Sequence, residues 1–126
     1  MNTGKKLLIG VMAAVILLAV LSLTLLNRHS SQMRMSALMR EGRLAMDAHD
    51  YAEAIDLYRL AISLDGRSVE AYMRLASACI LNGDLEDAKY FLELGLRKTE
   101  SPRLREAYNE FLGNLAVEER GEEGGE

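Results

Sequence analysis

The feature that most constrains the fold of this chain is a segment that returns in weakened form 34 residues later. The first copy is HDYAEAIDLYRLAISLDG, residues 49–66, and the second is GDLEDAKYFLELGLRKTE, residues 83–100. Small and large apolar positions coincide between the copies, as in Ala54 with Ala88 and Tyr58 with Leu92. A fixed period of roughly 20 to 50 residues indicates stacked repeats, and about 34 residues is the period of helix–turn–helix units. We therefore predict an all-α fold built on two such repeats.

The residues before each copy match as well, with Leu38, Glu41, Gly42 and Ala45 answered by Tyr72, Leu75, Ala76 and Cys79. The chain resembles the tetratricopeptide repeat family, whose pattern combines spaced apolar and small residues with an A-x-x-x-F segment and a closing Pro. The matching positions are Leu38, Gly42, Ala45, Ala54 and Tyr58, and then Tyr72, Leu75, Ala76, Cys79, Ala88 and Leu92. Glu41 replaces a usual Leu, and Gly66 and Glu100 replace the usual Pro. The resemblance covers residues 35–102 and implies a module that binds other proteins.

Start and stop signals divide the repeat region into five helices. We expect helices over 35–48, 51–64 and 69–81, a fourth that begins after Asp84, and a fifth that begins at Pro102. The predicted N-cap residues are Asp50, with Glu53 as its capping-box partner, Ser68, Asp84 and Ser101. We assign 35–68 to the first repeat, 69–101 to the second, 102–117 to a capping helix and 118–126 to a disordered acidic tail.

Apolar stripes on these helices predict which residues form the core. The inward positions are Ala54, Ile55, Tyr58, Ala61 and Ile62; then Tyr72, Leu75, Ala76 and Cys79; then Ala88, Phe91, Leu92, Gly95 and Leu96; and finally Leu104, Tyr108, Phe111, Leu112 and Leu115. Gly42 is expected to let a neighbouring helix approach closely.

Residues 7–26, LLIGVMAAVILLAVLSLTLL, carry no charged side chain. As a helix, such a run spans about 30 Å, which is the thickness of the hydrocarbon core of a bilayer. We predict that residues 1–27 form an N-terminal tail and a single transmembrane helix, and that 28–34 form a polar linker. The alternative is a cleaved signal peptide, although its apolar region is usually about 7–15 residues long and ends in an Ala-x-Ala-like site, which does not follow here.

The basic residues that flank the apolar run bear on its orientation. Lys5 and Lys6 precede it, whereas four arginines follow it within residues 28–43, so a simple count does not favour a cytoplasmic N-terminus. Arg40 and Arg43, however, fall in a predicted folded helix, and export signals begin with a short basic tail. We expect a single-pass protein of the plasma (inner) membrane, with a cytoplasmic N-terminus and the repeats outside.

Charge and residue types narrow the classes of function. Beyond residue 27 the chain has 13 basic and 19 acidic residues, a balance that argues against nucleic acid as the main partner. The single Cys79 and the two His residues do not form the usual metal cluster, and no catalytic motif is present. We therefore expect no enzyme activity, no metal and no cofactor.

The resemblance implies a concave groove lined by the first helix of each pair. The candidate groove residues are Met39, Arg40, Arg43, Met46, Met73, Arg74 and Ser77. Arg40 and Arg43 are three residues apart and share a helix face, and Arg74 follows Arg40 by one period of 34. Met adapts to varied apolar shapes and Arg is common at interfaces, so this groove suits a peptide with apolar anchors and an acidic group. In the alternative interpretation the Met side chains are core or membrane-facing and the Arg side chains are merely solvated.

These features predict a non-enzymatic, membrane-anchored adaptor or assembly factor for a membrane-associated complex. The alternative is a permanent structural subunit of a larger membrane complex with no free peptide groove. Because roughly three repeats are expected for independent stability, an uncovered end near Met35 also makes self-association an open alternative. A small membrane-tethered enzyme, or the regulatory subunit of one, is the remaining class.

Overall fold

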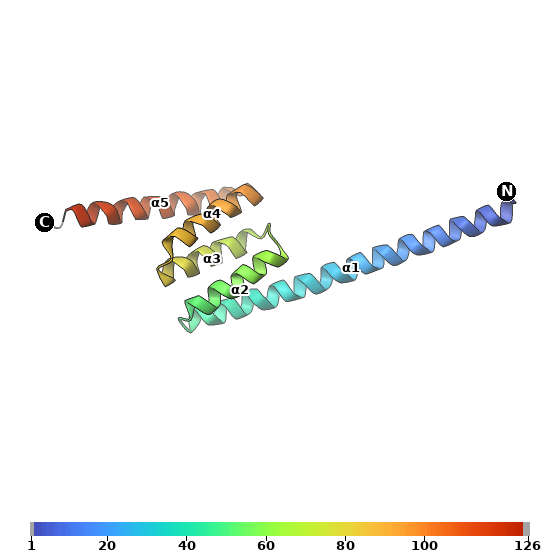
Figure 1. Ribbon diagram of the computed structural model, residues 1–126, viewed down its shortest axis with the longest axis horizontal. Coiled ribbons are helices and arrows are strands. Elements are labelled where there is room, and N and C mark those ends of the chain that lie inside the picture. The colour runs from blue at the N-terminus through green and yellow to red at the C-terminus, as the bar shows by residue number, and fades with distance from the viewer. Residues whose placement is uncertain (1, 125–126) are drawn as a thin grey trace. The chain divides into compact units, whose positions relative to one another are not determined.

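The computed structural model describes residues 2–124 and contains five helices, with no strand in that range (Figure 1). They are α1 (Thr3–Asp47), α2 (Tyr51–Leu64), α3 (Val69–Asn82), α4 (Leu85–Thr99) and α5 (Pro102–Glu123). The chain divides into two compact units, residues 1–34 and 35–126. The predicted all-α class, a long apolar N-terminal helix followed by short helical repeats, is confirmed.

The first unit is the part of α1 that contains the apolar run. Its large apolar side chains between Leu7 and Leu26 are more than half exposed, and the helix is long and apolar enough to cross a membrane. The two hydroxyl groups in the run donate to backbone carbonyls of the same helix, Ser22 to Leu18 and Thr24 to Leu21, each at 2.8 Å. Such bonds leave no polar group of these side chains without a partner, as a hydrocarbon environment requires.

Residues 28–34 differ from the expected linker because they are helical within α1. Between Gly10 and Gly42 the sequence contains neither Gly nor Pro, so nothing interrupts the backbone hydrogen bonds. The Ser30 hydroxyl, rather than ending the helix, donates to the Asn27 carbonyl at 2.9 Å. The boundary between the two units nevertheless falls at residue 34, where the linker was expected to end.

In the second unit the helices pack in chain order, α2 on α3, α3 on α4 and α4 on α5, while α3 also contacts α5 (Figure 1). The buried core includes most predicted inward positions, among them Ala54, Tyr58, Tyr72, Leu75, Cys79, Ala88, Leu92 and Leu104. Two further alanines of α3, Ala71 and Ala78, are also buried. Leu112 differs from its expected place, because it remains 36% exposed on α5.

Two of the four predicted N-caps form as expected. The backbone N–H of Glu53 donates to Asp50 Oδ1 at 3.1 Å, and that of Ala71 donates to Ser68 Oγ at 3.3 Å. The side chains of Asp84 and Ser101 make no capping bond. Asp84 instead accepts from Asn82 Nδ2 at 2.7 Å, within a turn in which Gly83 has a φ of 84°.

The C-terminal helix is longer than predicted. It was expected to end at residue 117 and to lead into a disordered tail over 118–126, but residues 118–123 are helical. Glu and Arg dominate this segment, and both are good helix formers. Residues 125 and 126 of the expected tail lie outside the described range.

Close packing at glycine brings α1 and α2 together, as predicted for Gly42. A Cβ built on Gly42 would lie 2.4 Å from Cε1 and 2.7 Å from Cζ of Tyr58, whose ring is fully buried. Gly95 plays the same part between α4 and α3, because its Cβ would lie 2.8 Å from Cγ of Tyr72. Each repeat therefore places an aromatic ring against a backbone that has no side chain.

We expect Gly42→Ala to lower the free energy of unfolding by about 1–3 kcal/mol, because the buried Tyr58 ring must shift to admit the new methyl group. Urea unfolding of the full chain in detergent micelles, followed by circular dichroism, measures the change. Gly113→Ala on α5 is the matched control, since no heavy atom lies within 4 Å of its added Cβ. The control should raise stability by about 0.5–1 kcal/mol through helix propensity. Equal effects of the two substitutions would contradict the packing described above.

Candidate functional site

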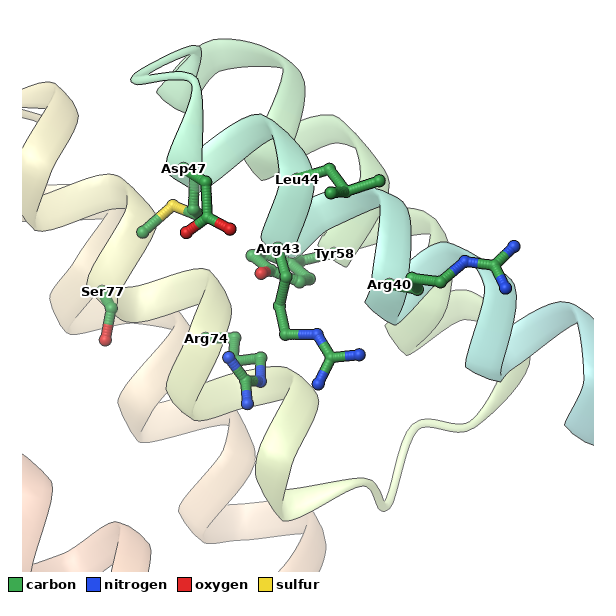
Figure 2. A pocket seen from close by; sticks show the side chains of 8 residues that line it. Arg40, Arg43, Leu44, Asp47, Tyr58, Arg74 and Ser77 are labelled. Atoms are coloured by element: carbon green, nitrogen blue, oxygen red, sulfur yellow. The ribbon is translucent and has the colours of Figure 1, made fainter.

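The predicted groove residues all belong to the second unit and come from two helices. Met39, Arg40, Arg43 and Met46 lie on α1, and Met73, Arg74 and Ser77 lie on α3. Five of these seven residues line one pocket with a volume of about 340 Å³ (Figure 2). We call it the arginine pocket, and its lining is Arg40, Arg43, Leu44, Met46, Asp47, Tyr58, Arg74 and Ser77.

The three arginines of this pocket differ in how they are paired. Arg74 donates from Nε to Glu70 Oε1 at 2.8 Å, and this hydrogen bond raises the pKa of the guanidinium. The pair is solvent-accessible, with Arg74 36% and Glu70 58% exposed, so it contributes little to stability. Among the described residues, neither Arg40 nor Arg43 has an ion-pair partner. The Arg43 guanidinium, which lies near that of Arg74, is therefore available to an external anion, whereas the Arg40 side chain extends away from both (Figure 2).

The phenol of Tyr58 lies behind Arg43 in the same pocket (Figure 2). The residue is fully buried, and its hydroxyl has no hydrogen-bond partner within residues 2–124. Burial raises the pKa of this hydroxyl, and the charges of Arg74 and Arg43 oppose the rise only in part, so the group stays protonated near neutral pH. The Arg74 guanidinium donates from Nε to Glu70 and also lies close enough to the Tyr58 hydroxyl to lower its pKa as a hydrogen-bond donor, although the contact does not reach full hydrogen-bond geometry. An unpartnered buried hydroxyl is costly, and a ligand oxygen would relieve that cost.

The sequence placed Tyr58 in the core but did not assign a role to its hydroxyl. The residue type could have indicated such a role. The repeat pattern has Phe at this position, and Phe, unlike Tyr58, has no hydroxyl that needs a hydrogen-bond partner. Asp47 and Leu44, which also line the pocket, were not predicted either. Asp47 follows Arg43 by one helical turn and contributes an acidic side chain to the lining.

The three methionines predicted to line the groove do not line a single pocket. Met46 lines the arginine pocket and packs on the core, whereas Met39 is partly buried against the core and does not line the pocket. Met73 lines a second pocket instead. The predicted set is thus divided between two adjacent sites and the core.

The second pocket, which we call the apolar pocket, has a volume of about 580 Å³. Its lining comes mainly from α3, α4 and α5: Met73, Ala76, Ser77, Ile80, Leu85, Leu92, Ala107, Glu110, Phe111, Asn114, Leu115, Val117 and Glu118. The sequence does not predict this pocket, because the apolar stripe of residues 102–117 indicates only a helix that covers the core. The extension of α5 beyond residue 117 adds Glu118 to the lining.

Neither a metal-binding cluster nor a reactive thiol is found among the described residues. Within residues 2–124, no group of three or more His, Cys, Asp or Glu side chains is placed to hold a metal ion. Cys79 is fully buried, and burial raises the pKa of its thiol to about 11. The thiol is therefore protonated at neutral pH and is not a nucleophile.

The comparisons with known proteins agree with this geometry. The family model described as tetratricopeptide repeat matches residues 45–110, which is just over half of the chain. The match begins at the end of α1 and extends into α5, so it includes both copies of the recurring segment. No curated protein matches the sequence. The chain belongs to the tetratricopeptide repeat family.

Proposed function

We propose that this protein is a membrane-anchored adaptor, or assembly factor, that holds a carboxylate-bearing segment of a partner protein in the arginine pocket. The repeat family is a protein–protein interaction module and is generally non-enzymatic. The observation that carries the proposal is that Arg40, Arg43 and Arg74 line one pocket together with Tyr58, whose buried hydroxyl lacks a partner with full hydrogen-bond geometry among the described residues.

The charge of the pocket differs from that of the domain around it. Residues 35–126 contain 11 basic and 19 acidic side chains, so the domain carries a net negative charge. The charged residues that line the arginine pocket are instead three arginines and one acidic residue, Asp47, counted over the described residues. Such a pocket attracts a single anionic group of a ligand, whereas the acidic surface around it repels a ligand that is acidic throughout. Charge-assisted hydrogen bonds from a guanidinium to a carboxylate are short and strong, and Arg can make two of them in parallel.

The anchoring part of the proposal rests on residues 7–26. Twenty uncharged residues in a helix match the thickness of a bilayer core, and their apolar side chains are exposed. We place the protein in the plasma (inner) membrane with its N-terminus in the cytoplasm and the repeats outside. A signal sequence has a similar composition, and its cleavage would leave the repeat domain without this anchor.

A permanent subunit of a larger membrane complex is the second candidate. Exposed leucines favour it, since Leu44, Leu60 and Leu81 are 61%, 53% and 56% exposed within a small domain. Obligate interfaces cover such side chains, and they are more apolar than exchangeable ones. Binding that exchanges and depends on salt distinguishes the adaptor from a subunit that is purified in fixed stoichiometry.

We expect the mature protein to retain the apolar run, because its length exceeds that of a signal-peptide core and no Ala-x-Ala-like site follows it. Intact mass measurement of the protein extracted from membranes tests this. A mature form that begins near Leu23 would contradict anchoring by this helix.

We expect the double substitution Arg43→Ala with Arg74→Ala to abolish capture of the partner that co-purifies with the wild-type protein in detergent. Loss of a desolvated charge pair costs about 2–5 kcal/mol, whereas loss of a rim contact mainly changes association rate and salt dependence. The melting temperature should change little, since Arg43 is exposed and the ion pair of Arg74 is with exposed Glu70. Arg103→Ala on α5, outside both pockets, is the control. Partner retention by the double variant would favour permanent docking instead.

We expect Tyr58→Phe to stabilise the domain and to weaken partner binding. The hydroxyl is buried without a partner, so its removal should raise the free energy of unfolding by up to about 1–3 kcal/mol. Urea unfolding measures the first effect, and titration with the partner measures the second. Greater stability with unchanged affinity would show that the bound carboxylate does not reach the hydroxyl.

A further inference from the structure

The arginine pocket and the apolar pocket adjoin at Ser77, which lines both. Ser77 is small, and its hydroxyl donates to the Met73 carbonyl of its own helix at 3.0 Å. The side chain therefore presents no unsatisfied polar group where the pockets meet. Because the two pockets share Ser77 and α3 lines both of them, we treat them as one binding surface, which we call the joint groove.

The joint groove changes sign from one part to the other. The charged residues of the arginine pocket are three arginines and Asp47, whereas those of the apolar pocket are Glu110 and Glu118, counted over the described residues. Both glutamates are exposed on α5, and neither has an ion-pair partner among the described residues. A ligand with one kind of charge would be attracted at one part of the groove and repelled at the other.

The rest of the lining of the apolar pocket is mostly apolar. Met73 of α3 and Phe111 of α5 lie on the core side, while Ile80 and Val117 are 41% and 66% exposed. Covering such surface stabilises a complex by about 25 cal/mol per Å² of apolar area removed from water. An apolar side chain of the ligand therefore fits between its two charged groups.

We propose that the joint groove binds a partner segment with a fixed order of side chains, namely an acidic group, then one or more apolar residues, then a basic residue. The acidic group occupies the arginine pocket, the apolar side chains contact Met73 and Ile80, and the basic group pairs with Glu110 and Glu118. This inference rests on the proposed function and adds the chemistry of the bound segment and the relative positions of its charged groups. A phosphate or an acidic lipid headgroup supplies only the first of these three elements.

Selection from a phage-displayed library of short random peptides, against the full chain in detergent micelles, tests the order. Enriched peptides should carry acidic and basic residues on opposite sides of an apolar residue, in one consistent direction. One enriched peptide is then synthesised, and its Kd is measured for the wild-type chain and for two charge-reversal variants. Alternation of charges without order, or enrichment of acidic residues alone, would overturn the proposal.

The variants separate this inference from the proposed function. Glu110→Lys with Glu118→Lys should raise the Kd of the selected peptide about tenfold or more, and replacing the basic residue of the peptide by Glu should restore binding to this variant. Glu106→Lys with Glu119→Lys, on the same helix but outside the pocket lining, is the matched control and should leave the Kd within about twofold. Arg43→Glu with Arg74→Glu should abolish binding of the original peptide.

Each outcome of these measurements has a different interpretation. If only the arginine variant loses the peptide, the fixed order is wrong and carboxylate binding by the arginine pocket stands. If neither variant changes the Kd, both proposals fail. A full chain that forms dimers by analytical ultracentrifugation and binds the peptide only after dissociation would assign the joint groove to a second copy, which overturns the partner named here.

Discussion

The contact between Gly42 of α1 and the ring of Tyr58 on α2 is the interaction on which the rest of the domain depends. An aromatic ring that lies where a Cβ would otherwise be sets the distance between these two helices. The second repeat reproduces the arrangement with Gly95 and Tyr72, although the roles of the helices are exchanged. With so few residues in the core, close backbone approach replaces the bulk of large side chains, and this makes the packing intolerant of added volume.

The same ring links packing to the candidate site. Its carbon atoms fill the space beside Gly42, and its hydroxyl lies at the arginine pocket without a partner that meets full hydrogen-bond geometry among the described residues. A Phe would pack equally well and would avoid the cost of burying a hydroxyl. The Tyr58 hydroxyl therefore lowers the stability of the domain, and in return it adds a hydrogen-bond donor to a charged pocket. Features that cost stability without a structural benefit are expected at functional sites rather than in the supporting core.

Much of this fold could be predicted from local sequence signals. The bounds of α2 follow from Asp50 and from the Asp65-Gly66 stop, and Arg40 and Arg74, which the 34-residue period relates, line the same pocket as Arg43. What failed depends on interactions that local patterns do not encode. Asn82 donates a hydrogen bond to the carboxylate of Asp84, which therefore does not cap the helix. The apolar pocket forms because α5 packs on α3 and leaves part of its own apolar stripe uncovered. Likewise, whether the Tyr58 hydroxyl finds a hydrogen-bond partner depends on its surroundings and cannot be predicted from its residue type.

The position of α3 explains how two repeats can support a binding surface. This helix contacts α2, α4 and α5, and it contributes Tyr72, Leu75 and Cys79 to the core from one face. Its opposite face supplies Arg74 and Ser77 to the arginine pocket and Ser77 to the apolar pocket. A ligand in the joint groove would therefore contact the helix through which the core is connected. Since a ligand that binds only the folded state stabilises it by mass action, binding there would act on the stability of the whole domain. Because a domain with a small core has a small free energy of unfolding, the stabilisation by a bound ligand is a large fraction of that free energy.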